Sequence, residues 1–316
     1  MTLSPSRLGS WFLPVGLTLL TGLLPAAAAR AEGVVDRVAR SGELVLVGHP
    51  DQAPMLSLDG QGRPVGYAME VADRIAAELA VAVGRPVRLR FEPVADPADL
   101  GQRLVGGQAD LACGVPFTWE RDITLDYSLP FGLSGLRLLA PAGRLDGSPQ
   151  SLAGRRIGVV ANSLGETELK GIQPKARPVG FADLSQAVAA LRGGSVDGVI
   201  GDSTLLAGLV AGGKGAALAQ TPSEPYERYA VACLVPENDS AFRNLVNLAI
   251  ARLLQGYLDG QPEAVSVIDR WVGPGSALNR TPDQIRNYFD AVLLGVEALR
   301  PLPAQAGSTP TRPTAP

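Results

Sequence analysis

The chain has 316 residues, of which 19% are charged and 46% are hydrophobic, and its formal net charge is −3. This length allows two domains at roughly 100–200 residues per domain. The sequence has no basic block, which argues against nucleic acid as a partner. With two cysteines and one histidine, a zinc site would need carboxylates to complete its ligands. We therefore expect no metal and no cofactor.

Residues 1–31 have the three-part pattern of a cleaved secretory signal. Arg7 provides the positive segment, Trp11 to Leu24 form the apolar segment, and small residues that fit the cleavage rule follow. A membrane anchor is the alternative, but the apolar run is shorter than the ~20 residues that span a bilayer and contains Pro14. We expect export to the periplasm without stable membrane insertion.

From Val34 onward the chain alternates strand-like and helix-like segments, which is typical of α/β proteins with parallel strands. The first series has predicted strands at 44–48, 87–91 and 110–113 and helices at 67–83 and 96–104. The second has predicted strands at 136–140, 157–160, 178–181 and 196–200 and helices at 184–191 and 204–210. A strand at 229–235 and helices at 241–258 and 282–299 follow. Residues 301–316 are rich in proline and are expected to be disordered.

We interpret this order as two α/β lobes joined by two chain crossings. Residues 32–137 and 229–300 form lobe 1, and residues 138–228 form lobe 2. In open parallel sheets, ligand-binding loops lie beyond the carboxyl ends of the strands. The segments HPDQAP, CGVPFTWER, ANSLGE and GDS occupy that position. Because small-ligand pockets concentrate at domain interfaces, a cleft between the lobes is the expected site.

Two charged residues in these loops are candidate ligand contacts. Arg121 follows a strand end, and its planar guanidinium suits a carboxylate. Its alternative role is a surface ion pair with Asp122 or Asp126, since most arginines are solvated. Asp202 ends an apolar strand, where it would receive a ligand ammonium or cap the helix that follows. The residues alone leave both alternatives open.

Other polar residues carry weaker signals. The turn at 162–166 connects a strand to a helix, where free backbone N–H groups favour anions. His49 is the only histidine, and a catalytic base needs oriented partners that the sequence does not indicate. No nucleophile motif is present, so we expect a protein that is not an enzyme.

Cys113 and Cys233 both lie in apolar, strand-like runs. An oxidising compartment permits a disulfide between them. Two small buried thiols are the alternative, because free cysteine is often a core residue.

Several motifs, taken in order, resemble the family 3 extracellular solute-binding proteins over about residues 34–272. The most specific stretch is GGQADLACGVPFTWERDITLDYSLPF. It is flanked by RSGELVLVG and, later, by SLAGRRIGVVANSLGE, LRGGSVDGVIGDS and ERYAVACLVPENDSAFRNL. The resemblance implies the two-lobed, type II periplasmic-binding-protein fold. Each lobe is then an α/β sheet flanked by helices, and the ligand cleft lies between the lobes.

The resemblance also implies roles for individual residues. Arg121 then clamps the α-carboxylate of the ligand, and Asp202 receives its α-amino group. The turn of lobe 2 that holds the carboxylate comprises Ser163, Leu164 and Gly165, and the further candidate ligand residues are Gly114, Thr118 and Asp51. Between Asp110 and Arg121 the chain is shorter than the family pattern. The aromatic residues that usually sandwich the ligand are not evident, and the candidate substitutes are Phe117, Trp119 and Tyr127.

The predicted function is that of a monomeric secreted binding protein for a small polar, amino-acid-like ligand, with an ABC permease as its partner. One alternative is an orphan binding protein for a peptide or modified peptide. GHPDQAPM and CGVPFTWERD are similar to an orphan subgroup associated with a radical-SAM peptide-maturation system. A second alternative is a dehydratase-like enzyme on the same fold.

Overall fold

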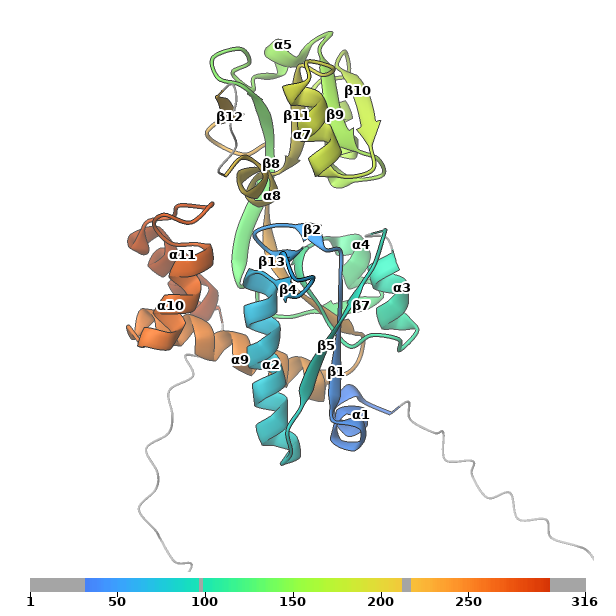
Figure 1. Ribbon diagram of the computed structural model, residues 1–316, viewed down its shortest axis with the longest axis vertical. Helices are drawn as coiled ribbons and strands as arrows, with labels where there is room; N and C mark the ends of the chain where they lie inside the picture. The colour runs from blue at the N-terminus through green and yellow to red at the C-terminus, as the bar shows by residue number, and fades with distance from the viewer. Residues whose placement is uncertain (1–31, 97–98, 212–216, 296–316) are drawn as a thin grey trace, which may run out of the picture. The chain divides into compact units, whose positions relative to one another are not determined.

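The computed structural model describes residues 32–96, 99–211 and 217–295. The predicted signal segment (1–31) and the predicted disordered tail (301–316) lie outside the described residues. Within the described part the chain is a mixed α/β protein (Figure 1). No helix of that part has both the length and the apolar character needed to cross a bilayer.

The elements of the predicted lobe 1 come from two separate portions of the chain. The first portion holds α1 (Val34–Ser41), β1 (Glu43–Gly48), β2 (Asp51–Gln52), β3 (Leu56–Leu58), β4 (Pro64–Val65), α2 (Tyr67–Val83), β5 (Arg88–Pro93), α3 (Asp99–Val105), β6 (Ala112–Pro116), α4 (Trp119–Asp122) and β7 (Leu125–Tyr127). The second portion holds α9 (Ser240–Leu258), α10 (Pro262–Trp271) and α11 (Pro282–Leu294). Figure 1 shows α2 and α9 side by side although they are far apart in the sequence.

Lobe 2 lies between these portions in the sequence. Its elements are β8 (Gly132–Pro141), α5 (Pro149–Leu152), β9 (Arg156–Val160), α6 (Leu164–Ile172), β10 (Arg177–Phe181), α7 (Leu184–Arg192), β11 (Gly198–Asp202), α8 (Ser203–Val210) and β12 (Leu218–Thr221). Strand β13 (Glu227–Pro236) then returns the chain to lobe 1, where it pairs with β6 and β7. Strands β10, β9 and β11 are parallel neighbours, and β8 pairs antiparallel with β11. The apolar runs of β9 and β11 are buried, as expected of strands covered by helices on both faces.

The two long strands β8 and β13 are the chain crossings between the lobes. They pair antiparallel with each other over residues 132–136 and 227–231. Beyond this shared stretch β8 pairs with β11 and β12, whereas β13 pairs with β6 and β7. The domain boundaries predicted at 137/138 and 228/229 fall in these strands and stay predictions.

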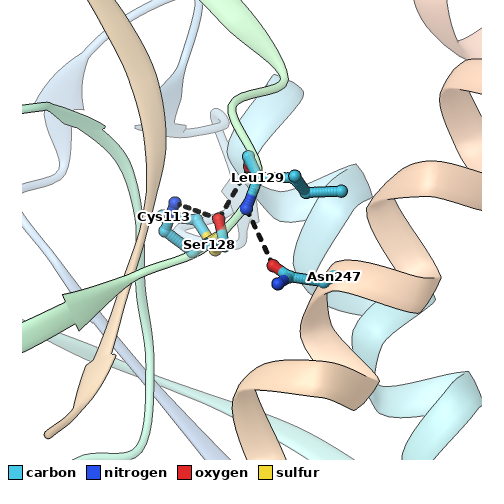
Figure 2. Close-up of a disulfide and its surroundings, with 5 residues drawn as sticks. Cys113, Ser128, Leu129 and Asn247 are labelled. Carbon is cyan, nitrogen blue, oxygen red and sulfur yellow. Dashed lines mark hydrogen bonds between the residues drawn. A yellow bond between two sulfur atoms is a disulfide. The ribbon is translucent and has the colours of Figure 1, made fainter. Parts of the chain in front are cut away.

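A disulfide joins Cys113 of β6 to Cys233 of β13, which are directly opposite each other in the strand pairing. Figure 2 shows the polar groups around it. The backbone N–H of Cys233 donates to Ser128 Oγ at 2.9 Å, and that hydroxyl donates to the Leu129 carbonyl at 2.8 Å. The N–H of Leu129 donates in turn to Asn247 Oδ1 of α9 at 2.7 Å. Of the two alternatives for the cysteines, the structure has the disulfide.

Candidate functional site

Strand β6, helix α4 and the turn between them hold three of the predicted ligand residues. Gly114 has φ of 82°, and a Cβ at this position would lie 3.2 Å from the Ala68 Cβ, so the backbone there favours glycine. Thr118 caps α4, because its Oγ1 accepts the N–H of Arg121 at 3.4 Å. The N–H of Thr118 donates to the Tyr127 hydroxyl at 3.2 Å. These bonds fix the turn from which Arg121 extends.

Arg121 is half-buried, and its Nη1 donates to the Pro116 carbonyl at 3.3 Å. The predicted alternative, an ion pair with Asp126, is not formed, since Asp126 pairs with Arg243 at 2.9 Å. Asp122 is not its partner either: within the described ranges Arg121 forms no ion pair. A carboxylate is the group that a free guanidinium fork binds best.

The turn after β9 and the start of α6 hold the next three predicted residues. Ser163 caps α6: its Oγ accepts the N–H of Glu166 at 3.3 Å and donates to the Val160 carbonyl at 2.7 Å. Leu164 and Gly165 are the first residues of the helix. A Cβ at Gly165 would lie 3.3 Å from the Ile200 carbonyl oxygen of β11, so the start of α6 lies against the strand that ends in Asp202.

Asp202 is half-buried and caps α8, as the alternative interpretation of this residue predicts. Its Oδ1 accepts the N–H groups of Thr204 at 2.8 Å and Leu205 at 3.0 Å, and its Oδ2 accepts the Tyr229 hydroxyl at 2.7 Å. Burial raises the pKa of Asp202, and the hydrogen bonds from Leu205 and Tyr229 oppose that rise. In the part of the chain that the structure describes, no cation pairs with this carboxylate.

Sequence reasoning missed Tyr229, which lies on β13 and is buried. Burial and the neighbouring charge of Asp202 raise the pKa of its hydroxyl well above the usual value, so Tyr229 acts as a hydrogen-bond donor. Its partner is 27 residues away along the chain, and no local pattern indicates such a pairing.

Asp51 is exposed on β2 and accepts the Ser185 hydroxyl of α7 at 2.7 Å. This bond connects a predicted ligand residue of lobe 1 with an element of lobe 2. His49 accepts the N–H of Asp51 at Nδ1 (3.3 Å). No hydrogen bond or ion pair between described residues joins Arg121 to Asp202. The structure therefore brings the predicted residues together in two separate groups, one around Arg121 and one around Asp202, and no described hydrogen bond joins Asp51 to either group.

An aromatic cluster adjoins Arg121 in the sequence. The Phe117 ring centroid lies 4.9 Å from that of Trp119 and 4.7 Å from that of Tyr127. Trp119 is 74% exposed, which makes it available to an apolar group that approaches this turn.

This chain is similar to known proteins in both sequence and structure. The family described as bacterial extracellular solute-binding proteins, family 3, matches residues 44–261. The glutamate/aspartate import solute-binding protein of Salmonella typhimurium is 24% identical over 272 residues, which cover 84% of this chain and 88% of that protein.

Two solved structures share the fold. The first is a mutant of ArgBP from T. maritima, with a TM-score of 0.64 and 21% identity, covering 75% of this chain and 98% of that one. The second is an ancestral amino acid-binding protein described as a precursor of cyclohexadienyl dehydratase, with a TM-score of 0.64 and 21% identity, covering 76% and 99%. At this identity the likeness shows the two-lobed fold alone. Together with the family match over most of the described chain, it shows that this protein belongs to the bacterial extracellular solute-binding proteins of family 3.

Proposed function

We propose that this protein captures a small polar, amino-acid-like ligand between its lobes in the periplasm and delivers it to an ABC-type importer. Arg121 binds the ligand carboxylate and Asp202 binds its ammonium group. The remaining ligand contacts are Ser163, Leu164, Gly165, Gly114, Thr118 and Asp51.

The observation that carries this proposal is a pair of charges that form no ion pair with any described residue. Among the described residues, Arg121 of lobe 1 forms no ion pair, and the half-buried Asp202 of lobe 2 receives hydrogen bonds but no cation. A zwitterion carries both complementary charges. The partly buried start of α6 adds backbone N–H groups that favour the carboxylate. The similarity to a glutamate/aspartate import protein supports the same ligand class.

The paired strands β8 and β13 suit a hinge between the lobes. A ligand that contacts both lobes only when they approach each other selects the closed form. The bond between Asp51 and Ser185 is a contact of the kind that closure makes between the lobes.

The first experiment identifies the ligand. Native mass spectrometry of the purified protein reveals any retained small molecule, and calorimetric titration with glutamate, aspartate and arginine tests the amino-acid class. If Arg121 and the ligand form a buried charge pair, Arg121→Ala should cost roughly 2–5 kcal/mol, or about 30- to 4000-fold in affinity.

The matched control is Arg144→Ala, because Arg144 is exposed in a turn of lobe 2 and, among the described residues, only its backbone makes a hydrogen bond. This variant should bind as tightly as the wild type. Equal affinity of Arg121→Ala and the wild type would exclude Arg121 from the site.

The family and the relatives are binding proteins, and we propose that this protein also releases its ligand unchanged. Two side chains could serve as acids in such a reaction, and both have local structural partners: His49 accepts the N–H of Asp51, and the Glu166 carboxylate accepts the N–H of Asn162 at 2.8 Å. Incubation of the identified ligand with the protein, followed by NMR, should show no product. A product would favour the dehydratase-like alternative.

The importer and orphan alternatives differ in the partner. An importer requires a permease, so a permease gene beside this one and binding of free amino acids would support our proposal. Binding of a peptide or modified peptide, with no permease gene nearby, would support the orphan alternative. Light scattering tests the expected monomer.

A further inference from the structure

A cavity of about 540 Å³ lies beside the crossing strand β8, and none of the predicted ligand residues lines it. Its walls come from β8, α8, β12 and the loop at 275–280 that precedes α11. A second cavity of about 470 Å³ shares four of its lining residues, which are Arg137, Ser203, Leu278 and Arg280. The two cavities are therefore neighbours.

The charges that line these cavities are unbalanced. In the described part of the chain, the charged residues of the first cavity are two arginines, Arg137 and Arg280. The second cavity adds Arg228 and Glu224, which form an ion pair with each other. Neither Arg137 nor Arg280 forms an ion pair with any described residue, so two guanidinium groups line one cavity without a counter-charge.

Two backbone carbonyl groups hold the Arg137 side chain in place. Its Nε donates to the Pro222 carbonyl at 2.8 Å, and its Nη2 donates to the Gln220 carbonyl at 3.1 Å. Its Nη1 makes no hydrogen bond within the described residues and remains available as a donor. The side chain is therefore oriented before any ligand arrives, which lowers the entropic cost of binding.

The surroundings of Arg137 disfavour its positive charge. Burial and, after it, repulsion from Arg280 lower the pKa of its guanidinium. Two like charges that face one cavity repel each other, and an anion placed between them removes this repulsion and adds charge-assisted hydrogen bonds.

We infer that this cavity is a second binding site, which binds a small oxyanion of the phosphate or carboxylate class. Arg137 and Arg280 are the residues that bind the anion. The inference does not rest on the proposed function, because none of the residues assigned to the amino-acid ligand lines either cavity. The chemistry shared by both anion classes is a set of oxygens that accept from two guanidinium groups.

The test uses calorimetric titration of the purified protein at low ionic strength, because salt screens exposed charges. The probes are inorganic phosphate in one arm and succinate in the other. We expect at least one of them to bind with a Kd of about 1 mM or tighter. Phosphate alone would identify a compact oxyanion, and succinate alone would identify an organic carboxylate. Failure of both to bind would overturn the inference.

Three variants locate the bound anion. Arg280→Gln should weaken binding about tenfold or more, and it should fold normally because Arg280 is exposed. Arg144→Gln removes the same charge from another exposed position and should leave binding unchanged. Arg121→Ala should leave phosphate binding unchanged, since Arg121 does not line the cavity. Binding that survives in Arg280→Gln, or phosphate binding that is lost in Arg121→Ala, would assign the anion elsewhere and contradict the inference.

Discussion

At the residue scale, Asp202 serves helix α8 as its cap and carries the negative charge of the candidate site. Capping requires an oxygen that accepts the N–H groups of Thr204 and Leu205, and asparagine provides such an oxygen almost as well. Binding an ammonium group requires the negative charge itself. The two roles can therefore be separated by substitution.

We predict that Asp202→Asn keeps the cap but removes a pH dependence of stability. Because burial raises the folded-state pKa of Asp202 above its unfolded value, the folded wild type binds a proton more readily than the unfolded chain. Its free energy of unfolding, measured relative to Asp202→Asn, should therefore rise as the pH falls from about 7 toward about 4. Urea unfolding at both pH values measures this difference.

A second substitution serves as the control for that prediction. Asp202→Ala also removes the charge but loses the cap, so it should lower the free energy of unfolding by about 1 kcal/mol relative to Asp202→Asn at both pH values. If wild type and Asp202→Asn respond identically to pH, the carboxyl is not shifted upward and the prediction fails.

The sequence predicts the positions of Arg121 and Asp202 because both follow strand ends, where ligand loops lie. It does not predict Tyr229 or Ser185, which bond to Asp202 and Asp51. Tyr229 is 27 residues from Asp202 along the chain, and Ser185 is 134 residues from Asp51. Only the folded chain brings each pair together. The assignment of Arg121 and Asp202 to a ligand stays a prediction, since no described contact joins them.

At the element scale, the pairing of β8 with β13 controls how the chain passes between the lobes. Gly135 lies in this pairing, opposite Arg228. A Cβ at Gly135 would lie 2.3 Å from the Glu227 carbonyl oxygen and 2.8 Å from the Pro225 Cβ. The paired strands leave no space for a side chain at this point.

We predict that Gly135→Ala lowers the free energy of unfolding by about 1–3 kcal/mol, because overpacking forces the backbone to shift. Gly171→Ala is the matched control: Gly171 lies in α6 with nothing within 4 Å of an added Cβ. That substitution should leave stability unchanged or raise it by up to about 1 kcal/mol. Urea unfolding of both variants tests the pair, and equal effects would show that the crossing strands adjust freely.

The alternation of strands and helices was predictable from hydrophobic patterns, but some elements were not assigned. Strand β8 begins at Gly132, whereas the pattern indicates a start at Leu136. Its first residues include two glycines and a serine, which have low strand propensity, and pairing with β13 stabilises them. Helix α10 was missed although Pro262 at its first position is a helix-start signal.

At the scale of the whole molecule, lobe 2 is inserted into lobe 1 through two chain crossings. The disulfide joins β6, which precedes the insertion, to the second crossing strand, β13. Cys113 and Cys233 are separated by 120 residues in the sequence, and the segment between them contains all of lobe 2. Separate hydrophobic clusters form the interior of each lobe. The bridge therefore closes a loop that contains an entire α/β unit with its own core.

We predict that reduction of this disulfide lowers the free energy of unfolding by about 2–5 kcal/mol, because the bridge restricts the unfolded chain over a long loop. Urea unfolding of the wild type with and without a phosphine reductant measures the change. The Cys113→Ala, Cys233→Ala double variant is the control, since the reductant should not alter its stability.

Because the bridge joins two strands of lobe 1, ligand affinity should survive reduction under conditions where the protein remains folded. Loss of affinity in the folded, reduced protein would show that the bridge also holds the turn of Arg121 in place, since that turn follows directly from β6.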